Sequence, residues 1–210
     1  MDEIVKQAMA RWPNVPHCYG WLALDARGVW RMRDERAQAL KLPGDKIAHA
    51  TLLGFINRNY QHDAQGRWYF QNGPQRVYIN LEATPYVAHN TPDQGFVLHT
   101  GTPLDDVERA WMTKEGRLIL QTGEILAQVD DRDMAACLAL LRLDGKHIDD
   151  EQLLEWLNLQ DKTAGEAVGE AAGVLTMRLN APYHRQIDVQ HAELPELAQR
   201  FNFVSAPQAD

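Results

Sequence analysis

The sequence feature that most constrains the fold is a turn motif that occurs three times. Each copy opens with Asp or Thr, carries glycine three positions later, and continues into an alternating, strand-like run. In such a turn the opening side chain bonds to the backbone, and glycine takes a positive φ angle before the chain returns. The copies are Asp25–Met32, Asp63–Phe70 and Thr113–Leu120. They predict three hairpins, the first two anchored to the core by the Trp that follows the glycine.

The spacing of these turns indicates a repeated supersecondary device rather than a solenoid. The copies open at positions 25, 63 and 113, which are 38 and 50 residues apart, whereas solenoid repeats keep a fixed period. A duplication within the chain is one explanation of this internal repeat, and the sequence alone leaves it open.

Short strand-like segments joined by close turns fill the middle of the chain. Turns such as Asn72-Gly73-Pro74 favour neighbouring strands that pair antiparallel. The predicted strands are Arg67–Gln71, Gln75–Glu82, Pro85–His89, Phe96–Thr100, Ala110–Thr113, Arg117–Gln121 and Glu124–Val129. The predicted fold class is α+β, an antiparallel sheet meander with packed helices and repeated Gly-turn hairpins.

Helical periodicity and capping residues frame this meander. Helices are predicted from Asp45 to about Tyr60, from Asp130 or Asp131 to near Gly145, from Asp149 or Asp150 onward, and over Leu194–Phe203. The small-residue stretch 165–173 is expected to be a loop, Val174–Leu179 and Tyr183–Val189 strands, and 204–210 a loose tail. We predict an α+β domain over 1–143 and a smaller helix-strand-helix part over 144–210, with the boundary, and even a single domain, left open.

Charge and hydropathy exclude several functions. The 210 residues hold 21 Lys and Arg against 29 Asp and Glu, a net charge of −8, which disfavours nucleic acid as a partner. No segment approaches the roughly 20 apolar residues that cross a bilayer, so no membrane partner is expected. The first residues lack the basic-then-apolar order of a signal peptide, so a cytoplasmic location is predicted.

Several catalytic and cofactor-binding chemistries lack their residues. Ser205 is the only serine, so a serine triad has no nucleophile within a folded element. Neither G-x-x-x-x-G-K-[ST] nor G-x-G-x-x-G occurs, and no cofactor is predicted. Of the two cysteines, Cys137 lies on a helical stripe and reads as a small buried hydrophobe, and Cys18 follows His17 in a turn-like context.

The eight histidines do not show metal-ligand spacing, and no metal site is predicted. The best grouping is His89 with His99, on neighbouring predicted strands, with Glu82 upstream. Only one register would bring the two rings together, so a hydrolase- or lyase-type enzyme using these groups is an alternative function. Helix capping explains the carboxylates of Asp130, Asp131 and Asp133 better than a metal does.

The densest polar and aromatic segment predicts a ligand-binding surface. Amide, guanidinium and ring groups gather around a proline-fixed turn, a combination that suits a small polar or anionic ligand. The alternative is that the rings are core, the amides satisfy the turn, and Arg76 pairs with Glu82 or Asp63. The candidate ligand-binding residues are Asn57, Trp68, Tyr69, Gln71, Asn72, Gln75, Arg76 and His99. Catalytic residues are not assigned.

Three stretches carry a resemblance to known families. Trp12-Pro13-Asn14-Val15-Pro16, Trp30-Arg31-Met32-Arg33-Asp34 and the run Trp68-Tyr69-Phe70-Gln71-Asn72-Gly73-Pro74-Gln75-Arg76-Val77-Tyr78 resemble an uncharacterised proteobacterial family with a domain of unknown function. Over roughly residues 12–130 the chain also faintly resembles a second such family, in which Gly-x-Trp turns precede a Pro-Tyr-Val-Ala strand, here Pro85-Tyr86-Val87-Ala88. That resemblance implies repeated structural motifs and a proposed role in signalling. Neither family supplies catalytic residues to transfer.

Together these observations favour a non-enzymatic protein of the bacterial cytoplasm. It is expected to act as a ligand-binding or regulatory module in signal transduction, with a small polar or anionic ligand or a protein as partner. A protein–protein interaction module that docks through an exposed aromatic surface is a further alternative. The oligomeric state is not predicted.

Overall fold

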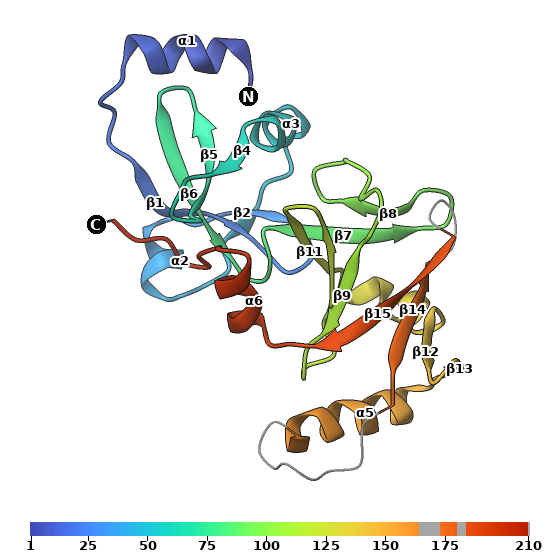
Figure 1. Cartoon of the computed structure of the whole chain (residues 1–210). Helices are drawn as coiled ribbons and strands as arrows, with labels where there is room; N and C mark the ends of the chain where they lie inside the picture. Colours follow the sequence, from blue (N-terminus) through green and yellow to red (C-terminus); the bar gives the residue numbers. More distant parts are fainter. Residues whose placement is uncertain (164–172, 180–183, 210) are drawn as a thin grey trace. The chain divides into compact units, whose positions relative to one another are not determined.

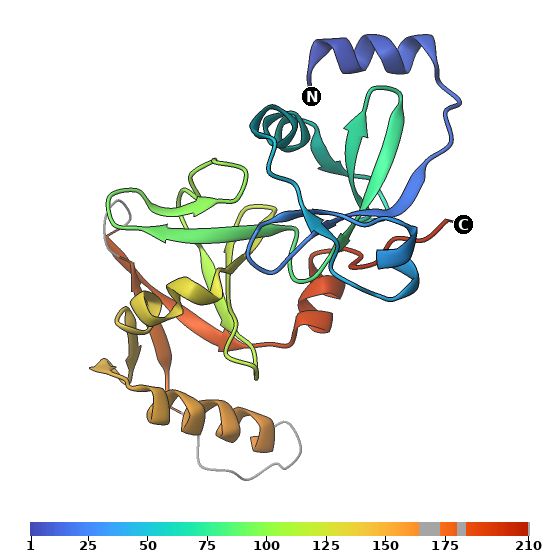
Figure 2. The same ribbon diagram turned by 180° about the vertical axis from the view of Figure 1, so that it is seen from behind.

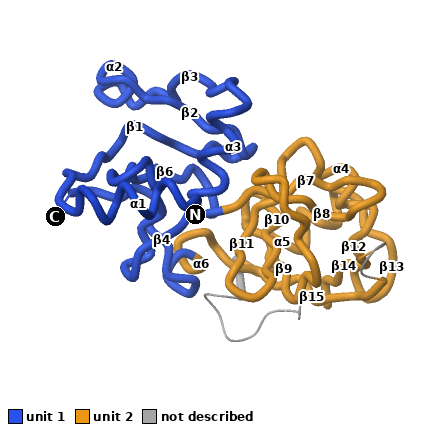
Figure 3. Tube along the Cα trace, turned by 90° about the horizontal axis from the view of Figure 1, so that it is seen from above, with its two compact units in different colours: residues 1–85, 198–210 blue, residues 86–197 orange. Residues whose placement is uncertain are grey.

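A computed structural model describes residues 1–163, 173–179 and 184–209 of the chain (Figure 1). The chain forms two compact units, which Figure 3 colours separately. Unit 1 consists of Met1–Pro85 and Ala198–Asp210, and unit 2 of Tyr86–Leu197. The first unit therefore contains both ends of this chain, and the second is continuous in sequence.

Unit 1 is built around one mixed sheet whose strand order is β3-β2-β1-β6-β5-β4. Phe55 of α3 packs edge-on against Phe70 of β5, with ring centroids 5.4 Å apart. The β5–β6 hairpin is seen from both sides in Figures 1 and 2. The elements are α1 (Glu3–Arg11), β1 (Cys18–Leu24), β2 (Trp30–Met32), α2 (Glu35–Ala39), β3 (Asp45–Lys46), α3 (Ala50–Arg58), β4 (Tyr60–His62), β5 (Trp68–Asn72) and β6 (Gln75–Leu81).

Unit 2 carries a longer sheet with the order β13-β12-β14-β15-β9-β10-β11-β7-β8. Its core joins strand residues to Trp156 and Leu157 of α5, and it includes Cys137, whose burial raises its thiol pKa to about 12. The elements are β7 (Tyr86–Thr91), β8 (Gly95–Leu98), β9 (Arg109–Met112), β10 (Leu118–Thr122), β11 (Ile125–Val129), η1 (Asp131–Asp133), α4 (Met134–Leu138), β12 (Leu141–Leu143), β13 (Lys146–His147), α5 (Asp150–Thr163), β14 (Leu175–Leu179) and β15 (Arg185–His191). Helix α6 (Leu194–Arg200) leads back to unit 1.

The three predicted turns share one geometry. Gly28, Gly66 and Gly116 have φ angles of 75°, 74° and 75°. In each turn the glycine N–H donates to the carbonyl of the opening Asp or Thr, at 2.9–3.0 Å. The prediction of positive φ at these glycines is confirmed. Trp30 and Trp68, which follow the first two turns, are buried as expected.

Each unit contains the same arrangement of five strands. In the first motif the hairpin β1–β2 joins the meander β4–β5–β6 through a parallel pairing of β1 with β6. In the second motif the hairpin β7–β8 joins the meander β9–β10–β11 through a parallel pairing of β7 with β11. The strand orders β2-β1-β6-β5-β4 and β8-β7-β11-β10-β9 are therefore equivalent.

The registers of the two motifs also agree. Adding 50 to each residue number of a meander pair in the first motif gives a pair in the second, so Tyr60↔Phe70 becomes Ala110↔Leu120. Adding 66 does the same for the hairpins, so Leu22↔Met32 becomes Ala88↔Leu98. The motifs differ in what links hairpin to meander: α2, β3 and α3 in the first, and residues 99–108 in the second.

The α+β class is confirmed, but the purely antiparallel meander is not. The strand pairs β1–β6, β7–β11 and β9–β15 are parallel, so both sheets are mixed. Each of these pairs joins segments far apart in sequence. Close turns between consecutive strands predict antiparallel pairs only, and none of these three parallel pairs is joined by such a turn.

Two predicted helices are shorter than expected. The helix expected from Asp45 begins at Ala50, where the His49 Nδ1 accepts from the Leu52 N–H at 3.3 Å, and Asp45 lies in strand β3. The helix expected up to Gly145 ends at Leu138, because Leu141–Leu143 pairs with β14 as strand β12. In both places a strand pairing from elsewhere in the chain takes residues that local capping signals assign to a helix.

The other expectations for the C-terminal third have mixed outcomes. The helix after Asp149 and the strand near 174–179 are present as α5 and β14, and the terminal helix ends at Arg200. The tail is not loose: the Val204 N–H donates to the Gly66 carbonyl at 3.0 Å, and the Ser205 carbonyl accepts from Leu81 at 2.7 Å. The loop predicted over 165–173 lies outside the described residues except for Gly173, and so does Tyr183.

The division into 1–143 and 144–210 stays a prediction. Strand β15, from the second of these parts, pairs with β9, from the first, inside one sheet. None of the helices in the described part of the chain has the length and apolar character that a bilayer crossing requires.

Candidate functional site

One face of the unit 1 sheet gathers polar and aromatic side chains. Tyr69 of β5 lies opposite Tyr78 of β6, and Gln71 lies opposite Arg76. Directly paired residues point to the same face, and alternate residues of a strand share a face. Tyr69, Gln71, Arg76 and Tyr78 therefore share one face, which we call the polar face; register also places Gln61, Arg67 and Asn80 there.

Tyr78 is the centre of an aromatic cluster on the polar face. Its ring stacks on Tyr19 of β1, with centroids 4.6 Å apart and planes 7° from parallel. Tyr69 and His17 approach the same ring edge-on, at 5.6 and 5.7 Å. Tyr78 is only 1% exposed, although it lies on the polar side of the sheet. Stacked and edge-on rings at these distances hold one another in place.

A hydrogen-bond network attaches this cluster to the second glycine turn. Asp63 Oδ2 accepts from Arg67 Nε at 2.9 Å and from the Tyr78 hydroxyl at 3.0 Å. Burial alone would raise the pKa of Asp63, but the hydrogen bonds from Arg67, Tyr78 and Gln65 outweigh it and lower the pKa. Asp63 is therefore a carboxylate whose charge is satisfied by its neighbours.

Arg76 differs from Arg67 because no carboxylate of the described residues forms an ion pair with it. Its guanidinium carbon lies 4.6 Å from the centre of the Tyr69 ring. Burial works against its charge, but a hydrogen bond with Tyr78 and the neighbouring tyrosine and Asp63 charges raise its pKa. Among the described residues it forms no ion pair, since Asp63 is paired with Arg67 and Glu82 Oε2 accepts from the Ala26 N–H at 3.1 Å. Neither Asp63 nor Glu82, the two carboxylates expected to pair with Arg76, therefore forms an ion pair with it.

Other predicted ligand-binding residues have structural contacts. Asn57 Oδ1 accepts from Trp30 Nε1 at 2.8 Å, which ties α3 to β2. Gln71 Nε2 donates to the Gly73 carbonyl at 2.9 Å, and Gln75 Nε2 donates to the Pro16 carbonyl at 3.0 Å. Trp68 points to the opposite face of β5, where it packs against Tyr60.

Asn72 is exposed at the end of β5. Of the eight predicted residues, Tyr69, Gln71 and Arg76 thus share the polar face, Asn72 and Gln75 adjoin its turn, and Trp68 and Asn57 lie elsewhere in unit 1. Their role in binding stays a prediction.

His99 belongs to unit 2, whereas the other seven predicted residues belong to unit 1. Its Nδ1 accepts from the Val87 N–H at 3.2 Å. Burial and the nearby His89 lower its pKa to about 3, so it is neutral at pH 7. The Val87 carbonyl also accepts from the His99 N–H, which places His99 diagonally from His89 on the same face of the β7–β8 hairpin.

His89 contacts two carboxylates, one just before η1 and one at its last residue. Its Nδ1 lies 3.2 Å from Asp130 and 3.8 Å from Asp133. Burial raises the pKa of Asp130, but hydrogen bonds from Arg132 outweigh it and lower the pKa to about 2. In the described part of the chain, no three His, Cys, Asp or Glu residues are grouped so as to hold a metal ion.

The predicted ligand-binding residues lack Tyr78 and three residues that contact it on the polar face, His17, Tyr19 and Arg67. His17 and Tyr19 lie on β1 or just before it, and β1 reaches the face only through its parallel pairing with β6. Arg67 is the first residue of a predicted strand. Alternate positions along that strand place Arg67 on the same face as Tyr69, so the sequence does contain this signal.

Comparisons with known proteins identify the family of the chain. The family model DUF2944, described as "Protein of unknown function (DUF2946)", matches residues 1–208. The chain therefore belongs to this family of proteins of unknown function. No curated protein matches it in sequence.

Two solved structures, both of DUF1285 family proteins, are similar to the chain. The protein from Silicibacter pomeroyi DSS-3 is 15% identical with a TM-score of 0.42, and the match covers 71% of this chain and 87% of that one. The protein from Shewanella baltica OS155 is 11% identical with a TM-score of 0.39, covering 55% of this chain and 88% of that one.

Proposed function

We propose that this protein is a ligand-binding or regulatory module whose polar face in unit 1 recognises a small polar or anionic ligand. The observation that carries the proposal is Arg76, a partly buried guanidinium stacked on Tyr69 with no ion-pair partner among the described residues. Guanidinium groups bind carboxylates and phosphates through charge-assisted hydrogen bonds. The ring of Tyr69 would hold the Arg76 side chain in position while its outer edge faces the ligand.

The two five-strand motifs supply an internal control for this proposal. Residues that occupy equivalent positions and make the same contact in both motifs serve the scaffold. Gln71 and Gln121 each donate Nε2 to the carbonyl of the glycine two residues later, at 2.9 and 2.5 Å. Arg67 and Arg117 make the equivalent cross-strand contacts, to Tyr78 and Gln128.

Tyr69 and Arg76, in contrast, have Ile119 and Leu126 as their counterparts. The same strand geometry is therefore stable without Tyr69 and Arg76. These two residues are candidates for a function that the second motif does not share.

The test is a thermal-shift screen of the whole protein against small anionic and polar metabolites, followed by titration of the hits. Arg76→Gln should weaken binding of a true polar-face ligand by about 1.5–3 kcal/mol. Arg36→Gln makes the same charge change at an exposed position outside the polar face and should leave binding intact. Equal losses in both variants, or none in Arg76→Gln, would contradict the proposal.

A protein partner is the second candidate function, and exposed aromatic side chains in unit 1 favour it. Trp12 is 50% exposed and Trp21 is 39% exposed. Exposed tryptophans are common anchors of protein interfaces. Capture of a partner by the wild-type protein, lost in both Trp12→Ala and Trp21→Ala, would favour this function over a small-molecule module.

The enzymatic alternative depends on the 3.2 Å contact between His89 and Asp130, because a carboxylate that orients a histidine is typical of general-base pairs. A hydrolase or lyase activity lost in His89→Gln would favour it. As part of our main proposal we place the protein in the bacterial cytoplasm, where Cys18 and Cys137, both free, stay reduced. We also propose that the two motifs arose by duplication, which the matching registers support.

A further inference from the structure

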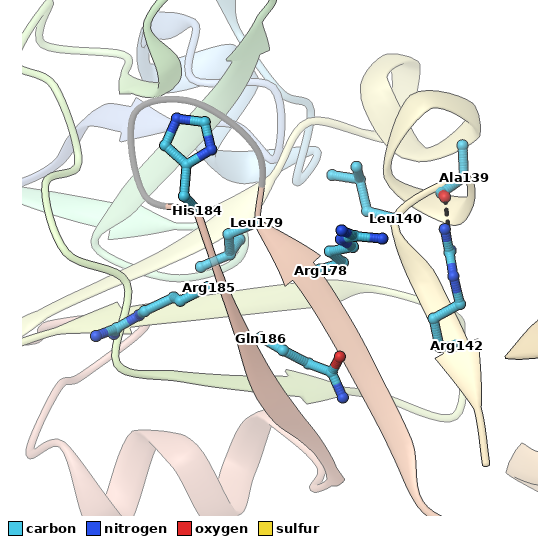
Figure 4. A pocket seen from close by; sticks show the side chains of 8 residues that line it. All are labelled: Ala139, Leu140, Arg142, Arg178, Leu179, His184, Arg185 and Gln186. Atoms are coloured by element: carbon cyan, nitrogen blue, oxygen red, sulfur yellow. Dashed lines mark hydrogen bonds between the residues drawn. The ribbon is translucent and has the colours of Figure 1, made fainter. Parts of the chain in front are cut away.

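A cavity on the sheet of unit 2 is lined by positively charged side chains. Its volume is about 430 Å³, and it lies between the C-terminal end of α4 and the strands β12, β14 and β15 (Figure 4). None of the described residues that line it is acidic, in a chain whose net charge is −8. Its lining residues are Ala139, Leu140, Arg142, Arg178, Leu179, His184, Arg185 and Gln186.

Strand register places three polar groups of this cavity on one face. Arg178 lies directly opposite Gln186, and Arg142 lies opposite Thr176, two residues before Arg178. Arg142 is therefore a diagonal neighbour of Arg178, at a Cα distance of roughly 7–8 Å that long side chains span. The intervening Met177 points to the other face, into the core.

The three arginines of the cavity differ in how their charge is satisfied. Arg185 is neutralised by Asp106, at 2.8 Å, and extends away from the other two in Figure 4. Arg142 Nη1 donates to the carbonyls of Ala139 and Leu141 at 2.8 and 2.6 Å, which fixes its position without cancelling its charge. The exposed side chain of Arg178 makes no hydrogen bond or ion pair within the described part of the chain.

We propose that this cavity is a binding site for a small oxyanion with two or more negative charges, held by Arg142 and Arg178. The planar forks of two guanidinium groups match phosphate and carboxylate oxygens, and the Gln186 amide adds a neutral donor beside them. The partly buried side chain of Leu140 provides apolar surface for the organic part of a ligand. The volume falls in the range of small-molecule sites. The site is separate from the polar face, since it uses other residues in the other unit.

The test is isothermal titration of the full-length protein at constant ionic strength, with pyrophosphate as the phosphate probe and citrate as the carboxylate probe. Saturable binding of either is expected, and the one that binds more tightly identifies the source of the oxyanion. Arg178→Gln should weaken binding at least about tenfold, the size of one charge-assisted contact. Because Arg178 is exposed and unpaired within the described residues, the Arg178→Gln variant should have the same melting temperature as the wild type.

Two further variants make the result specific. Arg142→Gln should weaken binding as Arg178→Gln does, whereas Arg36→Gln, with the same charge change at an exposed position in unit 1, should bind both probes like the wild type. The proposal is overturned if neither probe binds saturably, or if Arg178→Gln and Arg36→Gln have the same affinity. If the cavity binds neither probe, the proposed function of the polar face still stands, because that function is tested separately with Arg76→Gln.

Discussion

The two five-strand motifs of this chain have the same strand register but carry different side chains at equivalent positions. In the first, the meander face that holds Tyr69, Arg76 and Tyr78 is polar and cationic. In the second, Ile119 and Leu126 take two of these positions and are buried in unit 2. The glycine turns at Gly66 and Gly116 occupy equivalent positions, and so do the turn-closing glutamines Gln71 and Gln121. Residues that the two motifs share are those that the strand arrangement requires, and residues that differ are not required by it. Many related sequences are usually needed to make this distinction.

The largest expected effect concerns the turn glycines. A Cβ on Gly66 would lie 2.0 Å from the Asn202 carbonyl oxygen, whereas one on Gly116 would meet nothing within 4 Å. Both have φ near +75°, so Gly116→Ala should cost about 1 kcal/mol from backbone strain alone. Gly66→Ala should cost about 3 kcal/mol or more, because the backbone of the C-terminal segment has to move. Urea denaturation measures both, and equal losses would show that the close approach to Asn202 does not matter.

Acid should destabilise the second motif through His99. The folded state lowers the pKa of His99 to about 3, below the ordinary value of 6.5, so the unfolded chain binds its proton first. Stability should therefore fall as the pH falls below 6.5.

Between pH 6.5 and 4.5 we expect a loss of about 1–2 kcal/mol that is absent in His99→Gln. This window lies above the pKa of Asp130, about 2, so that carboxylate stays charged throughout. The equivalent position in the first motif is occupied by Arg33 instead of a histidine. Parallel pH profiles of the wild type and His99→Gln would refute the assignment.

The glutamines test the claim of a shared scaffold. Gln71→Ala and Gln121→Ala each remove one hydrogen bond to a turn carbonyl, and each should cost about 1 kcal/mol. Matching losses of unfolding free energy, with no effect of Gln71→Ala on any polar-face ligand, would assign Gln71 to the turn. A clear loss of ligand affinity in Gln71→Ala would return it to the binding site.

The smallest effect on stability is expected where the motifs differ most. Arg76→Leu introduces the residue that the second motif carries at Leu126. It removes a stacking contact worth about 0.5–1 kcal/mol but adds apolar contact with Tyr69, so stability should change by less than about 0.5 kcal/mol. A melting temperature lowered by several degrees would show instead that Arg76 is needed for the fold.

Local structure was predictable wherever neighbouring residues determine it. The turn glycines, the β5–β6 hairpin and the buried Cys137 follow from sequence patterns of a few residues. The parallel pairing of β1 with β6 does not, because it depends on two segments separated by α2, β3 and α3. His17 and Tyr19 were missed for the same reason, since they reach the polar face only through that pairing. The partner of Arg76 was also unpredictable, because two nearby carboxylates were available and each has another donor in the structure.

The hydrogen bonds that join Gly66 and Leu81 to residues 204 and 205 affect the order in which the two units can fold during synthesis. Unit 2 is continuous in sequence, so all of its strands are available once residue 197 has left the ribosome. Unit 1 begins earlier in the sequence, yet the Leu81 N–H can donate to the Ser205 carbonyl only after residues 82–205 have been synthesised. Domains generally fold in the order in which they are synthesised. Here the later unit can finish first, and the earlier one stays incomplete until residues 204 and 205 have been synthesised.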